Sequence, residues 1–98
     1  MAARPVKLHP DAIADGRGAR EWYEVRSESA AAAFMAELDH AIAEISAHPH
    51  RWPLHKRGTR RFLMRRFPYL VVYREVDDLI EVVAVAHGSR RPDYWKDR

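Results

Sequence analysis

The second quarter of the chain carries the clearest helical pattern. Apolar residues recur there every three or four positions, and most of the charged residues fall between them. The recurring apolar positions are Phe34, Leu38, Ala41, Ile42 and Ile45. This spacing predicts a helix from about Ala30 to Ala47. Ser27 or Ser29 can cap its start, and Pro49 ends it, because the residue before a proline is pushed out of the helical region.

The segment before it favours another helix, from Asp11 to Arg26. Pro10 and Asp11 suit a first turn, since proline loses no hydrogen bond there and an acid favours the positive end of the helix dipole. Gly16 and Gly18 each disfavour a helix by up to about 1 kcal/mol relative to alanine, so this helix depends on packing. Its large apolar anchors are Ile13, Trp22 and Tyr23. The short joint between the two helices predicts an antiparallel hairpin.

Strand patterns occupy both ends of the chain. A short alternating segment, Val6–Leu8, predicts a first strand, and three strands follow the helices at about Arg60–Phe67, Tyr69–Val76 and Leu79–Ala86. Pro68 ends the first of these three, because proline cannot donate to a central ladder. The last two are apolar on both faces, which is typical of inner strands.

This order of elements predicts an α+β fold. An N-terminal strand precedes an antiparallel helical hairpin, which packs on a mainly antiparallel β-sheet. The other face of the sheet needs a cover or is a binding surface. The C-terminal segment from Ser89 to Arg98 is a basic tail with room for one helical turn.

Length and composition limit the classes of protein. A chain of 98 residues is expected to form a single domain, residues 1–98. It contains no cysteine, which excludes disulfide scaffolds, cysteine zinc sites and thiol nucleophiles. Neither a secretion signal nor an apolar run of about 20 residues is found, so we expect a cytoplasmic protein without a membrane segment.

The formal net charge of +3 hides an uneven distribution. Residues 1–49 carry 5 basic and 8 acidic side chains, whereas residues 50–98 carry 12 basic and 6 acidic ones. Eight basic residues and no acid lie in one stretch: Arg51, Lys56, Arg57, Arg60, Arg61, Arg65, Arg66 and Arg74. Such a run favours an anionic partner, either nucleic acid or an acidic peptide. The alternative is a solvated face that forms salt bridges with the acidic first half.

Arginines on the predicted strand Arg60–Phe67 are one candidate site. Alternation places Arg61 and Arg65 on one face, about 7 Å apart, a separation that suits phosphate or carboxylate. The alternative is that both guanidinium groups extend past their apolar stems at the sheet edge.

A second candidate lies near the C-terminus. Its residues are His87, Arg90, Arg91, Tyr94 and Lys96. A histidine followed by arginine and tyrosine could supply acid/base chemistry and anion stabilisation for RNA cleavage. The alternative is a structural histidine at a strand end and a tail that packs on the sheet.

Two further features were weighed for ligands. The six histidines show no metal-ligand spacing, and no carboxylate lies between His48 and Arg74, so neither a metal site nor a cofactor is predicted. Trp52, between Arg51 and Pro53, could stack on a nucleobase or could pin its loop to the core.

Several motifs together resemble a known family. In the first half they are Trp22-Tyr23, Ala33-Phe34 with Leu38, His48-Pro49, and Arg51-Trp52-Pro53. In the second half they are Gly58-Thr59-Arg60-Arg61, Arg66-Phe67-Pro68-Tyr69-Leu70-Val71-Val72-Tyr73, Val85-Ala86-His87-Gly88-Ser89-Arg90-Arg91-Pro92, and Trp95. With this set the chain resembles the RelE/ParE superfamily of toxins from bacterial type II toxin–antitoxin systems, and is closer to the ParE-like members.

The resemblance implies a growth-inhibiting toxin of the plasmid-stabilisation type. A cognate antitoxin would wrap its sheet and helices in a hetero-oligomer and hold it inactive. ParE-like members poison DNA gyrase, and RelE-like members are endoribonucleases that cleave mRNA on the ribosome. A single loop lysine, Lys56, in place of a cluster favours the gyrase poison. A ribosome-dependent nuclease and a non-toxic nucleic-acid-binding module are the alternatives.

Two sets of residues follow from these interpretations. If the protein is a nuclease, the catalytic candidates are His87, Arg65, Arg61, Arg91 and Tyr94. The candidates for binding a partner or an anion are Arg51, Trp52, Lys56, Arg57, Arg60, Arg61, Arg65, Arg66, Arg74 and Arg90.

Overall fold

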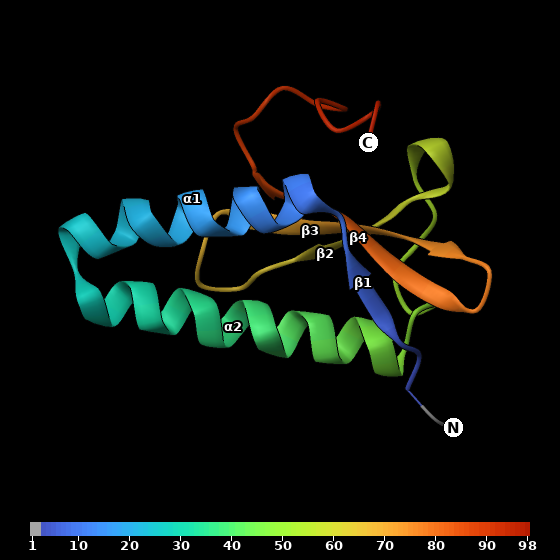
Figure 1. Ribbon diagram of the computed structural model, residues 1–98, viewed down its shortest axis with the longest axis horizontal. Helices are drawn as coiled ribbons and strands as arrows, with labels where there is room; N and C mark the ends of the chain where they lie inside the picture. The colour runs from blue at the N-terminus through green and yellow to red at the C-terminus, as the bar shows by residue number, and fades with distance from the viewer. Residues whose placement is uncertain (1–2) are drawn as a thin grey trace.

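A helical hairpin lies against one side of a four-stranded sheet in the computed structural model, which describes residues 3–98 (Figure 1). The elements are β1 (Val6–Leu8), α1 (Pro10–Arg26), α2 (Glu28–Ala47), the short 3-10 helix η1 (Lys56–Gly58), β2 (Arg60–Leu63), β3 (Tyr69–Val76) and β4 (Leu79–His87). This arrangement confirms the predicted α+β fold.

Side chains cap both long helices at their starts. The ring Nδ1 of His9 accepts a hydrogen bond from the Asp11 N–H at 3.0 Å, and Ser27 Oγ accepts one from the Ala30 N–H at 3.2 Å. Each cap satisfies a backbone N–H that has no partner within the helix. Ser27 is therefore the cap that the sequence left open, and α2 begins two residues earlier than predicted.

The sheet has the strand order β1-β4-β3-β2. The last three strands form the predicted antiparallel meander, and β1 pairs in parallel with β4, with Val6 opposite Ile80. The sheet is thus mixed at one edge only. A bulge at Val72 and Tyr73 shifts the register between β3 and β4.

The strand β2 is shorter than predicted, because it ends at Leu63 and not at Phe67. After Leu63 the backbone bends so that the Phe67 ring packs on Tyr23 and Phe34, with ring centroids 5.1 and 5.4 Å apart. Pro68 has no N–H to continue the ladder. Arg65 therefore lies in this bend, and the predicted pairing of Arg61 and Arg65 on one strand face is wrong.

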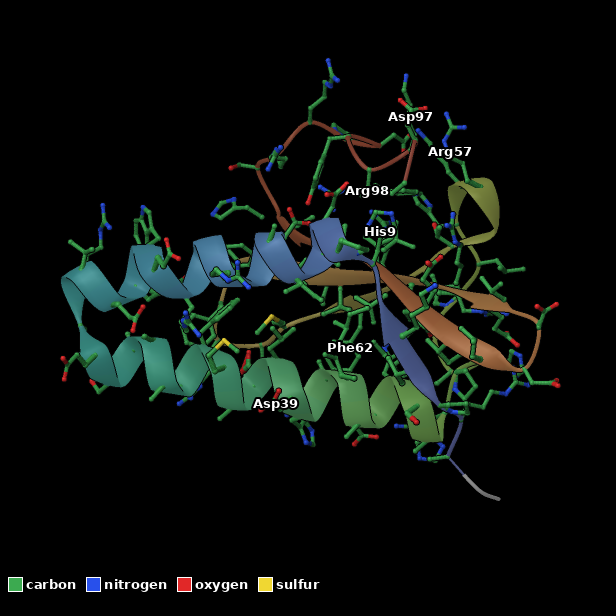
Figure 2. All side chains as sticks on the ribbon, in the orientation of Figure 1. His9, Asp39, Arg57, Phe62, Asp97 and Arg98 are labelled. Atoms are coloured by element: carbon green, nitrogen blue, oxygen red, sulfur yellow. The ribbon has the colours of Figure 1, made fainter. Side chains whose placement is uncertain are left out.

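The main core lies between the hairpin and the sheet. Phe34 and Ile45 of α2 are fully buried there, together with Val71 and Tyr73 of β3. Figure 2 shows Phe62 of β2 between the sheet and α2. Burial raises the pKa of Tyr73 to about 12, and its hydroxyl donates a hydrogen bond to the Pro49 carbonyl at 2.8 Å.

The opposite face of the sheet is covered by the C-terminal segment. Trp95 is 5% exposed and packs with Val72, Val83 and Ala84 in a second, smaller cluster. Residues 92–97 form turns without a regular helix. The cover that the sequence required is thus supplied by the chain itself.

Candidate functional site

The C-terminal segment, the end of β4 and β2 enclose a cavity of about 100 Å³. Four of the five residues predicted for a nuclease line it: Arg61, His87, Arg91 and Tyr94. Arg90 lines it too, as does His55, which the sequence analysis considered only among the six histidines for a metal site. We call this space the C-terminal cavity.

His87 sits where β4 ends. Its Nδ1 accepts a hydrogen bond from the Ser89 N–H at 3.0 Å and lies 2.7 Å from Ser89 Oγ. The edge of the ring packs on Tyr69, with centroids 5.0 Å apart. One ring nitrogen is therefore occupied by the turn that follows the strand, as the structural interpretation of this histidine expects.

The hydroxyl of Tyr94 points toward α1 and is not free for acid/base chemistry. It donates a hydrogen bond to Asp15 Oδ2 at 3.0 Å. Burial raises the pKa of Tyr94, the Asp15 carboxylate raises it further, and it reaches about 12. A phenol with this pKa stays protonated at neutral pH and donates its hydrogen bond to the Asp15 carboxylate.

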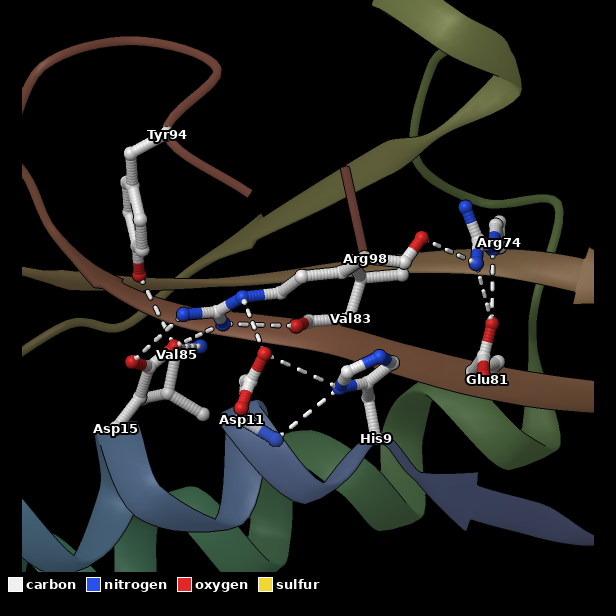
Figure 3. Close-up of polar contacts among 9 residues, drawn as sticks. All are labelled: His9, Asp11, Asp15, Arg74, Glu81, Val83, Val85, Tyr94 and Arg98. Atoms are coloured by element: carbon white, nitrogen blue, oxygen red, sulfur yellow. Dashed lines mark hydrogen bonds and ion pairs between the residues drawn. The ribbon is translucent and has the colours of Figure 1, made fainter. Parts of the chain in front are cut away.

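Asp15 is the centre of a network that fastens the C-terminus (Figure 3). Its Oδ2 also accepts a hydrogen bond from Arg98 Nη1 at 2.6 Å and from the Val85 N–H at 3.1 Å. Arg98 Nη1 donates to the Val83 carbonyl at 3.1 Å as well. The last residue of the chain is thus bound to both α1 and β4, which places the walls of the C-terminal cavity.

Ion pairs neutralise half of the basic stretch from Arg51 to Arg74. The pairs, with their N···O distances, are Arg51–Glu44 (3.8 Å), Lys56–Asp93 (3.6 Å), Arg66–Glu37 (3.8 Å) and Arg74–Glu81 (2.8 Å). Two of these acids belong to α2, in the acidic first half of the chain. The interpretation of a face that is salt-bridged to the first half is therefore correct for Arg51 and Arg66, whereas Lys56 and Arg74 pair with acids of the second half.

The other four basic residues of the stretch form no ion pair within residues 3–98. Arg60 donates a hydrogen bond to the Trp52 carbonyl, so it serves the loop. Arg61 faces the C-terminal cavity, and Arg57 is exposed on η1. Arg65 lines a different hollow of about 540 Å³, which lies between α2 and β2 and also contains Glu37 and Arg51. The structure therefore does not bring Arg65 to the other nuclease candidates.

Trp52 packs inward. Its ring contacts Phe62 and Tyr73, with centroids 4.9 and 6.5 Å apart. The Arg51 guanidinium lies 5.6 Å from its centroid on another side. These contacts pin the loop to the core, and the partly exposed remainder of the ring faces the hollow beside α2.

An apolar groove between α1 and α2 is a feature that the sequence analysis missed. It has a volume of about 240 Å³, and its apolar walls include Leu8, Ile13, Met35 and Ile42. Leu8 and Ile13 are 37% and 45% exposed. Arg20 also lines it. Its buried Nε has no hydrogen-bond partner in the described part of the chain and forms an ion pair with Glu24 Oε1 at 3.6 Å. Its signal in the sequence was the presence of apolar residues such as Ile13, Met35 and Ile42 on both helices.

Residues 3–98 offer neither a metal site nor a membrane-spanning helix. No group of three or more histidine or acidic side chains has the geometry to hold a metal ion. The region also contains no helix with the length and apolar character needed to cross a bilayer.

Comparisons with known proteins bear on this arrangement. Residues 6–92 match the model of the family described as the ParE toxin of the type II toxin–antitoxin system, parDE. A solved structure, from the chromosomal ParDE toxin–antitoxin system of P. aeruginosa, is similar with a TM-score of 0.77. The sequences are 16% identical, and the match covers 87% of this chain and 96% of the other. A comparison with curated proteins found no match.

The family match spans most of the chain, and the structural match confirms the fold. Both agree with the resemblance carried by the sequence motifs from Trp22 to Trp95. The chain belongs to the ParE toxin family of type II toxin–antitoxin systems.

Proposed function

We propose that this toxin arrests growth by poisoning DNA gyrase in the bacterial cytoplasm, and that a cognate antitoxin neutralises it in a hetero-oligomer. The family to which the chain belongs is described by its parDE pairing, and the similar structure comes from a ParDE system. The observation that carries the choice of target is the state of the nuclease candidates: four of the five line one cavity, but one of these four, Tyr94, has its hydroxyl bound to Asp15.

RNA cleavage needs an acid, a base and an anion stabiliser within reach of one phosphate. Arg61, His87 and Arg91 line one cavity, but the Tyr94 hydroxyl is bound to Asp15 and Arg65 lies in another hollow. With the Tyr94 hydroxyl engaged and Arg65 remote, an action by protein binding is favoured over the ribosome-dependent nuclease.

The groove between α1 and α2 is the surface that we assign to the antitoxin. Its apolar walls suit the apolar face of an amphipathic helix. The Arg20 guanidinium favours an acidic side chain on that helix, because its Nε makes no hydrogen bond and its ion-pair partner Glu24 is 3.6 Å away. An antitoxin segment with one acid among apolar residues would satisfy both.

The target is tested by expressing the protein without its antitoxin. We expect growth arrest, a DNA-damage response and intact mRNA. Purified toxin should then cause gyrase to accumulate cleaved plasmid DNA. Cuts in mRNA at codon positions would overturn the proposal in favour of the nuclease, and normal growth at confirmed expression would overturn both.

The antitoxin surface is tested with Ile13→Asp, which places a charge in the groove. We expect this variant to stay toxic and to escape neutralisation by co-expressed antitoxin. Lys7→Gln is the control, since Lys7 is exposed on β1 and lines none of the cavities described above. Full neutralisation of Ile13→Asp would remove the groove from the antitoxin interface.

A further inference from the structure

We infer that the C-terminal cavity binds a phosphate group of a nucleic-acid backbone without cleaving it. Three guanidinium groups line this cavity, from Arg61, Arg90 and Arg91. Within the described residues none of them forms an ion pair. The only carboxylate in the lining, Asp93, lies 3.6 Å from the Lys56 ammonium group. The cavity therefore holds an excess of positive charge that only an external anion can balance.

The chemistry of the cavity favours phosphate over other anions. Arginine presents its N–H groups as a planar fork that binds two oxygens of one phosphate at once. His55 and His87 add imidazole groups to the same walls. The cavity is small, about 100 Å³, and partly open to solvent, so an anionic group that is attached to a larger chain can enter it. Contacts of this kind position a backbone and are independent of sequence.

Contacts within the chain hold the walls of the cavity. Arg90 and Arg91 belong to the C-terminal segment, which Trp95 anchors in the smaller core cluster. The Arg90 guanidinium lies 4.0 Å from the centroid of the Tyr94 ring, and Tyr94 is itself held by Asp15. Arginines held in this way lose less conformational entropy when they bind.

For its biological role this inference rests on the proposed function. Gyrase works on DNA, so a toxin that holds a DNA phosphate could attach to the enzyme while the enzyme is bound to its substrate. The binding itself can be measured without gyrase, and this separates the two proposals.

The experiment measures binding of the full chain to a short labelled DNA duplex by fluorescence anisotropy at several salt concentrations. One neutralised phosphate predicts a slope of about −0.9 for log K against log salt. Arg61→Gln and Arg91→Gln should each reduce this slope toward zero, and complete loss of the contact is about an eightfold loss of affinity at 0.1 M salt. Lys7→Gln removes the same charge at the opposite edge of the sheet and should keep the wild-type slope.

Single-stranded DNA and RNA of the same sequence identify the source of the phosphate. We expect both to bind with a slope of about −0.7 per contact and to remain intact. Cleavage of the RNA would overturn binding without cleavage. Arg91 is exposed outside the strands, so its variant reports on the site even if Arg61→Gln lowers stability.

Three results would overturn the inference. One is no binding of wild type at about 50 mM salt, where backbone contacts are strong. Another is a salt slope that both arginine variants leave unchanged. The third is that these variants lose affinity for the antitoxin but keep their affinity for DNA, which would make the cavity a site for an acidic peptide. If gyrase is poisoned without DNA binding, the inference fails and the proposed function stands. If the toxin binds DNA but does not affect gyrase, the inference stands and the proposed function fails.

Discussion

Replacing Asp15 by asparagine should release the C-terminal segment and destabilise the whole domain. Asp15 and Arg98 are 11% and 14% exposed, and their closest atoms are 2.6 Å apart. Removing one partner of a buried ion pair costs about 3–5 kcal/mol, because the other charge stays buried without compensation. Arg98 keeps a weaker partner, Asp11, at 3.6 Å, so we expect a loss near the lower end, about 3 kcal/mol.

Urea unfolding followed by tryptophan fluorescence measures this loss directly. For a domain of this size, about 3 kcal/mol corresponds to a fall in Tm of roughly 12–24 °C. Tyr94→Phe removes only one hydrogen bond to the same carboxylate and should cost about 1 kcal/mol. Asp97→Asn is the matched control, since Asp97 is exposed in the same segment and forms no ion pair within residues 3–98; it should change stability by less than about 0.5 kcal/mol.

The comparison of these variants decides whether the reasoning holds. If Asp15→Asn costs no more than Tyr94→Phe, the pair with Arg98 contributes nothing beyond an ordinary hydrogen bond. The network would then be a surface feature, and the C-terminal segment would be held by the Trp95 contacts alone.

Three further predictions follow from other parts of the fold. Burial alone would raise the pKa of Glu75, but Arg4 and His50 outweigh it and lower the pKa below 4.5. The stability that this shift adds is present above pH 4.5 and is lost as the pH falls through the lowered value. Acid unfolding of Glu75→Gln should therefore lack this component. Tyr73 and Tyr94 have pKa values raised to about 12, so the stability that these shifts add is lost as the pH rises from 10 toward 12. In a pH titration, the phenolate absorbance of the folded protein should therefore rise at higher pH than that of the urea-unfolded chain. Coincident titration curves would contradict this. The fully buried Phe34 should cost about 3–5 kcal/mol when replaced by alanine, measured by the same urea unfolding, and a cost below about 1 kcal/mol would contradict the packing seen between hairpin and sheet.

Local patterns predicted the helices and most of the strands because their causes are local. The spacing of apolar residues in α2 and the capping hydroxyl of Ser27 act over one or two turns. The predicted end of β2 was wrong because the chain bends so that the Phe67 ring packs on residues more than 30 positions earlier in the sequence. No periodicity within residues 60–67 reports that contact. The parallel pairing of β1 with β4 is equally non-local.

The candidate site was predictable only in part, for the same reason. His87, Arg91 and Tyr94 are neighbours in the chain, so their presence at one place required only that the tail fold back. Asp15 and Arg98 are 83 residues apart, and nothing in either segment selects the other as its partner. That pair determines where the Tyr94 hydroxyl points, which is why a residue considered for catalysis has a structural role.

The basic stretch shows how the fold separates structural charge from charge that can face a partner. Arg51, Lys56 and Arg66 form ion pairs longer than 3.5 Å and keep 53–67% of their side-chain surface exposed. Exposed pairs of this kind add about 0–1 kcal/mol each, so they are not needed to hold the fold. The pairs of Arg51 and Arg66 remove positive charge from the face beside α2, and Lys56 is neutralised by Asp93 of the C-terminal segment. Together with the bound Arg74, they leave the uncompensated charge of the cavity on Arg61 and on the arginines of the C-terminal segment. The acids that the fold brings to the basic stretch therefore determine the side from which an anion approaches this protein. The number of basic residues alone does not determine it.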